Sequence, residues 1–419
     1  MGLKVAVLYS SFYRENRTTL LKYLFSFKRY AEGADFHYIN VNTTIPLFVK
    51  LFKYDAVILH YSFLGEFRFV RDSLRWNRKI KSLKKISGYK VALPQDEYDC
   101  TDFLHQLFKE AEIKLLYTCF SNINDIEKAY PKSKIGHVAI KSIFTGYIDE
   151  EDVLSLQLKI KSFKNRPIVI GYRARKLPAY LGAHSQIKSQ LTHLFKRLLK
   201  SNSLNYDILN TDEVNDTGND SLVKLGDSWY DFLLNCRSTL GCEGGASLID
   251  INGLIKQKVQ QYTQINPTAS FSEIEANCFP GQDFNISCFA LSPRHFEAAM
   301  CKTLQILVEG EYGGVFKPWK HYLPLKKDFS NAQEIIALLD DEIKCQQIVD
   351  NAYKDIVLSK RYTYRKFVNS IISDIKQNVI PNSGNNFWFK IVSFFLDIRN
   401  SFIWILHSIR TRVMHLLAS

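Results

Sequence analysis

The chain has 419 residues, of which 46% are hydrophobic and 23% are charged, and its formal net charge is +13. This length exceeds one ordinary hydrophobic core, so we expect two domains and a tail, and the composition excludes a largely disordered chain. The positive charge predicts an anionic partner: nucleic acid, a phosphorylated metabolite or an acidic membrane surface. Eight scattered cysteines show no zinc-ligand spacing, and we expect them to be buried thiols of a reducing cytosol.

The first part of the chain alternates short apolar runs with helical patterns. Strands are predicted at 4–10, 35–42, 54–62, 88–98, 113–121 and 135–140, with helical segments between most of them. Apolar runs of this kind are typical of strands buried on both faces, and their alternation with helices indicates a doubly wound parallel sheet. We therefore predict an N-terminal Rossmann-like domain over 1–160. Because the chain starts with a strand and lacks a signal-peptide pattern, we also expect it to be cytoplasmic.

The same alternation restarts after the basic stretch near residue 160. Strands are predicted at 166–176 and 205–210, a further strand leads into the glycine-rich stretch 241–247, and 254–285 has the character of an insertion. We predict a second Rossmann-like domain over 165–345 and closing amphipathic helices over 346–380. The expected fold class is α/β, with two doubly wound domains that face a cleft.

The tail, residues 385–419, is rich in Phe, Trp and Ile. Lys390, Asp397 and Arg399 interrupt any apolar stretch long enough to span a bilayer. Polar residues recur at helical spacing and leave a broad apolar face, and Trp388 and Trp404 suit the headgroup zone. We predict an amphipathic helix that lies on an anionic membrane surface; packing on the protein or in an oligomer is the alternative.

A basic stretch at 67–85 is the second candidate for membrane contact. Arg68, Arg71, Arg75 and Arg78 or Lys79 would share one face of a helix. Such a face could bind nucleic acid or anionic lipid, or could simply be solvated. Together with the tail it favours the membrane among these functions.

Ligands of doubly wound sheets bind at the carboxyl ends of the strands, so we examined the residues there. Arg173, Arg175 and Lys176 leave a buried strand, and their charge suits a phosphate group, although a solvated basic loop is the alternative. Further along, Gly244 and Gly245 permit close backbone approach to a ligand. Their neighbour Glu243 is a candidate for contacting sugar hydroxyls or for catalysis, with a turn-capping acid as the alternative.

The stretch "SPRHFEAAMCKTLQIL" predicts a helix followed by a buried strand. Ser292 is a good N-cap, and Pro293 fits the first helical position. The free amides and dipole of this helix start predict a phosphate site, to which Arg294 and His295 add polar side chains. Glu297 would either stabilise the helix dipole or accept hydrogen bonds from a ribose or sugar.

Three residues of the N-terminal half are candidate general bases. Asp96 and His60 lie at the ends of predicted strands, and Glu97 is next to Asp96. An inverting sugar transfer needs such a base to take the proton of the acceptor hydroxyl. The alternatives are a turn-forming Asp96 and a His60 satisfied within the core.

The stretch "RHFEAAMCKTLQIL" resembles the C-terminal signature of GT-B glycosyltransferases, and the resemblance extends over about 165–370. It implies a nucleotide-sugar donor held by the C-terminal domain, with Glu297 on the ribose or sugar and the basic residues on the diphosphate. Lys302 stands where the pattern has glycine, and Phe289 stands where the common retaining group has its first glutamate, so a retaining or inverting outcome stays open. The residues that match the signature in order are Arg294, Phe296, Glu297, Ala298, Cys301, Thr303 and Gln305.

A metal clamp for the diphosphate is not expected, because the chain has no D-x-D motif. No cofactor is expected beyond the nucleotide sugar as co-substrate. The leading hypothesis is a GT-B glycosyltransferase, peripheral on the inner face of a bacterial plasma membrane, that extends a lipid-linked or surface-polysaccharide acceptor of O-antigen or capsule type. The alternatives are a phosphoribosyl- or polyol-phosphate transferase and a non-catalytic scaffold of the same fold. A nucleic-acid partner explains the charge but not the tail and is not expected, while the oligomeric state stays open.

Overall fold

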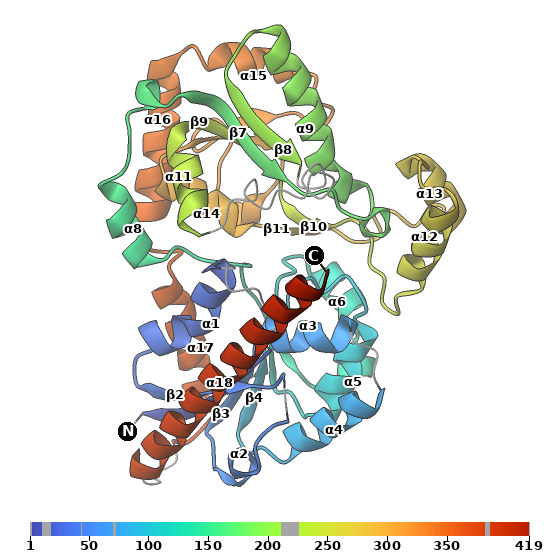
Figure 1. The fold of residues 1–419 in the computed structure, drawn as a ribbon, viewed down its shortest axis with the longest axis vertical. Coiled ribbons are helices and arrows are strands. Elements are labelled where there is room, and N and C mark those ends of the chain that lie inside the picture. The colour runs from blue at the N-terminus through green and yellow to red at the C-terminus, as the bar shows by residue number, and fades with distance from the viewer. Residues whose placement is uncertain are drawn as a thin grey trace.

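The computed structural model describes residues 2–10, 18–42, 44–69, 73–210, 226–381 and 386–418. Its elements form two parallel sheets, one in each half of the chain, with helices around each sheet (Figure 1). The predicted α/β class with two doubly wound domains is confirmed by these two sheets. All eight cysteines are buried free thiols, as predicted.

The N-terminal sheet has six parallel strands in the order β2-β1-β3-β4-β5-β6. Apart from Lys4, β1 consists of apolar residues and Tyr9, and it is fully buried because helices cover both faces of the sheet. The strands are β1 (Leu3–Tyr9), β2 (Ala34–Asn40), β3 (Ala56–Leu59), β4 (Tyr89–Ala92), β5 (Leu115–Thr118) and β6 (Ala139–Ser142). The helices are α1 (Thr18–Tyr30), α2 (Leu47–Leu51), α3 (Tyr61–Phe69), α4 (Ser73–Lys84), α5 (Asp102–Glu110), α6 (Ile123–Ala129) and α7 (Lys132–Ile135).

The C-terminal sheet has five parallel strands in the order β13-β12-β9-β7-β8, beside a two-stranded antiparallel sheet of β10 and β11. The strands are β7 (Ile168–Ala174), β8 (Tyr206–Asn210), β9 (Cys236–Gly241), β10 (Gly244–Ala246), β11 (Cys288–Ala290), β12 (Leu304–Val308) and β13 (Leu323–Leu325). The helices of this half are α8 (Glu150–Gln157), α9 (Ala183–Ser201), α11 (Asp227–Asn235), α12 (Leu254–Ile265), α13 (Phe271–Cys278), α14 (Pro293–Met300), α15 (Ala332–Leu338) and α16 (Glu342–Ala352).

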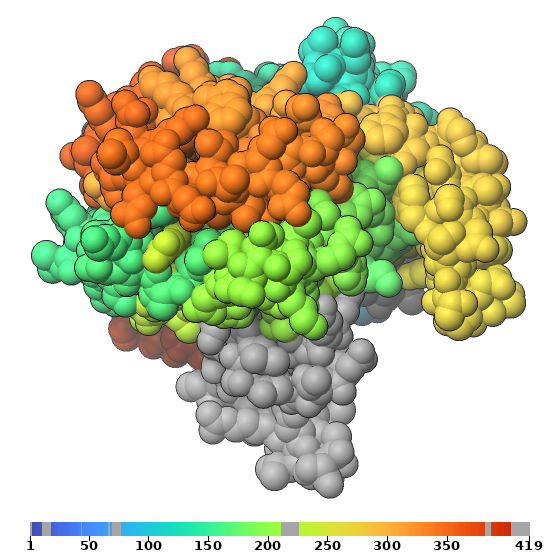
Figure 2. All heavy atoms as spheres, turned by 90° about the horizontal axis from the view of Figure 1, so that it is seen from above, coloured from blue at the N-terminus to red at the C-terminus, as the bar shows by residue number. Residues whose placement is uncertain are grey.

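The predicted insertion is a helical hairpin, α12 and α13, which stands at the side of the C-terminal domain (Figure 2). After α16, a π-helical segment at Tyr353–Leu358 leads to α17 (Tyr364–Lys376), which returns to the N-terminal domain. There Phe367 of α17 packs against Tyr23 and Phe27 of α1. The last element, α18 (Asn386–Ala418), lies on the N-terminal domain in Figure 1.

The loop that follows β4 fastens the two domains together. The predicted strand 88–98 ends at Ala92, and the residues after it form this loop. The amide of Cys100 donates to the carbonyl of Asp250 at 2.8 Å, and the amide of Asp250 donates to the carbonyl of Tyr98 at 2.8 Å. Lys256 adds an ion pair with Asp99 at 3.0 Å. These bonds fix the strand-end loop of one domain against the other.

The inner face of α18 packs against the edge strand β2. Phe389 and Leu396 are buried, and the ring of His37 stacks on Phe389 with centroids 3.6 Å apart. Asn400 donates to the carbonyl of Tyr38 at 2.8 Å, which satisfies an edge group of the sheet. None of the helices in the described ranges has the length and apolarity that a bilayer crossing requires. The side chain of Trp404 lies outside what the structure describes.

The prediction of one continuous basic face over 67–85 is wrong. The stretch contains the end of α3 and the whole of α4, and Arg68 at the end of α3 is buried. Its guanidinium donates to the carbonyls of Gln95, Asp96 and Asp99, because a buried cation needs hydrogen-bond acceptors. Lys79 is buried too, while Arg71 and the side chain of Arg75 lie outside the described residues.

Candidate functional site

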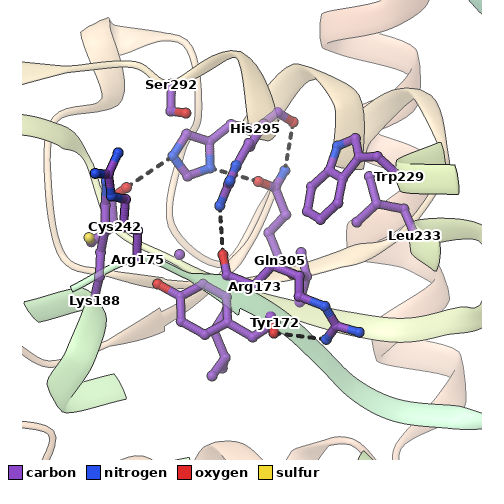
Figure 3. Close-up of a pocket in the computed structure, with 14 residues that line it drawn as sticks. Tyr172, Arg173, Arg175, Lys188, Trp229, Leu233, Cys242, Ser292, His295 and Gln305 are labelled. Carbon is purple, nitrogen blue, oxygen red and sulfur yellow. Dashed lines mark hydrogen bonds between the residues drawn. The ribbon is translucent and has the colours of Figure 1, made fainter. Parts of the chain in front are cut away.

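A cavity of about 230 Å³ opens at the carboxyl ends of β7 and β9. These two strands are neighbours in the sheet, and the chain leaves them toward opposite edges, so the cavity lies at the switch point where doubly wound folds bind ligands. In Figure 3, Arg175 and Lys188 approach from one side, Trp229 and Leu233 from the other, and Ser292 and His295 from above. We call it the cationic cavity.

Three cations at this cavity, Arg175, Lys188 and Arg294, form no ion pair with any carboxylate in the part of the chain that the structure describes. Lys188 is half-buried on α9. Burial lowers the pKa of Lys188 and Arg294 lowers it too, whereas the thiol of Cys242 and the carboxylate of Asp96 raise it. Uncompensated positive charge in a cavity is the environment that binds an anion.

Arg173 lines the cavity, but its charge is already paired with a carboxylate, and its contact with phosphate stays a prediction. Its guanidinium pairs with Asp207 of β8 at 2.7 Å and stacks over Phe232 at 4.3 Å. What Arg173 offers is its carbonyl, which accepts a hydrogen bond from Arg294 at 2.6 Å (Figure 3). This bond orients Arg294 across the cavity mouth.

The start of α14 forms another wall of the cavity. Ser292 has N-cap geometry, but its hydroxyl caps no amide of the helix, and Pro293 stands at the first helical position as predicted. The N-terminal end of the helix dipole therefore faces the cavity with a free hydroxyl beside it. His295 faces Gln305 Oε1 at 2.9 Å and the carbonyl of Cys242 at 3.2 Å. Burial lowers the pKa of His295 to about 4, so the ring is neutral at pH 7.

Two predicted donor residues lie elsewhere. Thr303 precedes β12, at the end of the sheet away from the cavity, where its hydroxyl donates to Leu233 O at 2.8 Å. Its assignment to the donor site is therefore wrong. Lys176 is exposed and does not line the cavity, and its amide donates to Asn210 Oδ1 at 3.1 Å.

Lys302, where the resemblance expects glycine, has a local structural explanation. Its φ of 49° is the left-handed conformation that ends a helix and that glycine adopts most readily. Its ammonium pairs with Asp350 at 2.9 Å, at the end of α14 opposite the cavity. The substitution therefore leaves the cavity unchanged.

Glu297 lies beside the cationic cavity and not within it. One carboxylate oxygen accepts a hydrogen bond from the indole N–H of Trp229 at 2.7 Å, and the other lies 3.5 Å from the hydroxyl of Thr19 in the N-terminal domain. Burial raises the pKa of Glu297. Trp229 lines both the cationic cavity and the smaller space around Glu297, so it connects the two.

A second cavity, of about 470 Å³, adjoins the first at Cys242. Its polar residues are neutral or acidic, apart from Lys327, and include Glu309 and Glu311 after β12 and Ser121 and Asn122 of the N-terminal domain. His184 stacks on Phe289 in its wall, with centroids 4.0 Å apart. We call this space the acidic cavity. Carboxylates, amides and an aromatic wall suit a ligand rich in hydroxyl groups better than a phosphate.

Glu243 reaches the acidic cavity but is largely engaged by the backbone. Its carboxylate accepts from the amide of Tyr312 at 2.7 Å, and burial raises the pKa of Glu243. The predicted glycine loop is in fact strand β10, in which Gly245 has a φ of 103° and packs against the carbonyl of Cys288. The glycines thus take part in the β10–β11 pairing, and their contact with a ligand stays a prediction.

Asp96 is exposed at the tip of the loop after β4. Its φ of 54° is left-handed, a strained conformation for a residue other than glycine that often marks a functional position. Arg68 holds its carbonyl, and the hydroxyl of Tyr98 donates to its carboxylate at 2.8 Å. Its negative charge raises the pKa of Lys188 in the other domain, against the larger lowering by burial.

The other two candidate bases are inside the protein. His60 is fully buried; its Nδ1 accepts from the amide of Ser62, and burial lowers the pKa of His60 to about 3. An acceptor cannot reach it, so the prediction of a catalytic His60 is wrong. Glu97 is also buried, with its carboxylate occupied by Thr118, Cys119 and Tyr130.

The sequence argument missed Lys188, Trp229 and Tyr172. Lys188 is one of several lysines in the amphipathic helix α9. It differs from the others only in lying near the start of the helix, which is close to the switch point. Trp229 lies in the first turn of α11. An aromatic residue near an acidic one is a common pattern of helix packing, so it did not indicate a site. Tyr172 precedes the predicted Arg173 on β7, and the alternation of side chains along a strand could have identified it.

No protein-family model matches the chain, and a search of curated proteins gives no significant match. Among solved structures it is similar to HepE from Anabaena in complex with UDP, with 11% identity, a TM-score of 0.44, and coverage of 90% of this chain and 100% of that one. An alpha-glucosyltransferase in complex with UDP-glucose and DNA containing an abasic site has 10% identity, a TM-score of 0.48, and coverage of 90% and 99%. Sucrose-phosphate synthase from Thermosynechococcus elongatus has 9% identity, a TM-score of 0.44, and coverage of 90% and 98%.

Proposed function

We propose that the protein transfers a sugar from a nucleotide-sugar donor to an acceptor hydroxyl, with the donor diphosphate in the cationic cavity. The observation that carries the proposal is the convergence of Arg175, Lys188 and Arg294 with the start of α14 at the switch point. Guanidinium groups, an ammonium and helix amides are the groups that bind phosphate oxygens. They would also stabilise the negative charge that develops on the departing diphosphate.

Asp96 is the general base of this proposal. It would take the proton of the acceptor hydroxyl while that oxygen bonds to the anomeric carbon and the bond from this carbon to the diphosphate oxygen breaks. Its exposure on the strand-end loop of the N-terminal domain supports the role. The acidic cavity between Glu309 and Ser121 offers space for the hydroxyl groups of a sugar.

The acceptor in this proposal is a lipid-linked or surface-polysaccharide glycan of O-antigen or capsule type, reached by a peripheral protein at the inner face of a bacterial plasma membrane. The exposed aromatic face of α18 supports a location at a membrane. The same proposal includes a contact between Glu297 and the ribose of the donor. Trp229 lines both the cationic cavity and the space around Glu297.

Thermal-shift measurements against UDP, GDP, CDP, TDP and ADP test the donor site. At least one diphosphate should raise the unfolding midpoint, because a ligand that binds only the folded state stabilises it. Stabilisation by phosphoribosyl diphosphate without any response to nucleotides would favour the phosphoribosyl transferase instead. No response to any of these compounds would favour the non-catalytic scaffold and contradict the proposal.

A further inference from the structure

We infer that α2 and α18 form one docking surface for an anionic bilayer, and that this surface belongs to the N-terminal domain alone. We define the α2–α18 surface by its exposed apolar side chains. They are Leu47, Phe48, Leu51, Trp388, Phe394, Phe395, Ile398 and Phe402.

The α18 part of this surface is a helix face whose side chains remain largely exposed in the folded protein. At 100° per residue, its five apolar side chains fall within an arc of about 120°, on the side of the helix opposite Leu396 and Asn400. They are 51–63% exposed, whereas Leu396 is fully buried. A large exposed apolar patch on a folded protein marks an interaction site.

Helix α2 adjoins α18 and extends the patch. Arg399 of α18 donates to the carbonyl of Thr44, just before α2, at 3.0 Å. Just after α2, the rings of Phe52 and Phe389 are 5.4 Å apart. Leu47 and Leu51 of α2 are 76% and 84% exposed, higher fractions than those of the α18 residues.

Charge identifies the occupant as a bilayer. Lys50 and Lys53 lie on or beside α2, and exposed Lys390 flanks the apolar arc of α18. The acid on this flank, Asp397, already has Lys28 at 3.6 Å. Lysines around an apolar aromatic face are the pattern of interfacial helices on anionic lipid. A second copy of this chain would instead bring like charges together.

The hold of α18 on the domain makes the docking rigid. The side chains of Arg399 and Asn400 bond to backbone carbonyls at and near β2, and the stacked rings of Phe389 and His37 fix the start of the helix. A docked bilayer would therefore immobilise the N-terminal domain. The conclusion that the acceptor is presented from the bilayer rests on the proposed function; the docking surface itself does not.

Co-sedimentation of the full-length protein with vesicles tests the inference. The protein should sediment with vesicles of phosphatidylcholine and phosphatidylglycerol, and less with phosphatidylcholine alone. The triple variant Trp388→Ser, Phe395→Ser, Phe402→Ser should lose at least about tenfold in partitioning onto vesicles. The reason is that three aromatic side chains no longer bury apolar surface in the bilayer interface. Its unfolding midpoint should not change, since the three side chains are exposed.

The control removes three still more exposed apolar side chains elsewhere: Leu158→Ser, Ile265→Ser and Ile343→Ser, which are 91%, 80% and 85% exposed. This variant should bind vesicles as the wild type does. The inference is overturned if the wild type does not sediment with anionic vesicles, or if both triple variants bind equally. It is also overturned if the α18 variant only converts a dimer to a monomer, which would make the face a contact between copies. Nucleotide-induced thermal shifts measured without vesicles keep the outcome for the donor site separate.

Discussion

The two domains share a doubly wound topology but differ in the charge of the residues at their strand ends. In the C-terminal domain, Arg175, Lys188 and Arg294 surround a helix start. In the N-terminal domain, the loop after β4 exposes the carboxylate of Asp96. One scaffold thus carries cationic side chains at its strand ends and the other an exposed carboxylate. The comparison teaches that function depends on the side chains placed at the strand ends and not on the sheets.

Buried charges also serve these two edges differently. The guanidinium of Arg68 donates hydrogen bonds to the backbone of the loop that carries Asp96. Arg173 is neutralised by Asp207 and leaves its carbonyl to Arg294. In each domain a buried arginine positions the exposed group that faces the cleft. Proximity of a basic residue to a strand end is therefore not enough to make it a ligand.

Asp96→Asn should have the largest effect. Sugar transfer should fall by about 10²- to 10⁴-fold, the usual contribution of a general base, while nucleotide binding is retained. Asparagine tolerates the left-handed backbone, so the loop should persist. Steady-state transfer rates and nucleotide titrations measure the two properties. Glu112→Gln is the matched control, an exposed acid with a φ of 57° that precedes β5. Equal loss in both variants would remove Asp96 from catalysis.

Gly245→Ala tests whether the glycines of the donor domain belong to the scaffold. An added Cβ would lie 1.7 Å from the carbonyl oxygen of Cys288, so we expect a loss of at least about 3 kcal/mol in the free energy of unfolding. At Gly244 the nearest atom would be 3.6 Å away, and Gly244→Ala should be tolerated. Denaturant unfolding of both variants makes the comparison. If the Gly245→Ala variant is stable and loses only nucleotide binding, the glycines contribute to the ligand site and not only to the scaffold.

Lys188→Met and Arg294→Gln should each weaken nucleoside diphosphate binding by roughly 10- to 100-fold, the value of one charge-assisted hydrogen bond. Isothermal titration measures the affinity. Lys302→Met removes a cation from the far end of the same helix, where it pairs with Asp350, and should leave the affinity unchanged. Unchanged binding in the first two variants would place the donor elsewhere.

Acid should destabilise both domains. Burial lowers the pKa of His37 to about 4, of His60 to about 3 and of His295 to about 4. The unfolded chain binds a proton at each of these groups near pH 6.5 and the folded chain does not. Stability is therefore present above pH 6.5 and falls as the pH drops toward 4, by at most about 1.4 kcal/mol per pH unit for each histidine. Unfolding midpoints between pH 7.5 and 4.5 measure it, and a flat profile would contradict these buried neutral rings.

Much of the fold could be predicted from the sequence, because buried parallel strands leave continuous apolar runs. β12 follows α14 as the run after Ser292 and Pro293 indicates. The start of α14 was equally predictable, because an N-cap residue, a proline and an arginine in succession indicate a helix start that can bind an anion. The resemblance located the helix but could not say what Glu297 contacts.

The rest of the site depends on contacts distant in sequence. Asp207, which neutralises Arg173, is 34 residues away and carries no mark of that role. The left-handed φ of Lys302 explains a departure from the signature that the sequence alone left unexplained. The loop that carries Asp96 is held against the C-terminal domain by bonds of residues 98–102 to the backbone around Asp250. Such pairings are consequences of the packed fold and not of local pattern.

A crystal structure with a bound nucleoside diphosphate tests the central claim most directly. The account predicts phosphate oxygens within about 3.2 Å of Lys188 Nζ, the Arg294 guanidinium and the first amides of α14. An ordered nucleotide whose phosphates lie in the acidic cavity beside Glu309 and Glu311, or anywhere outside the cationic cavity, would contradict it.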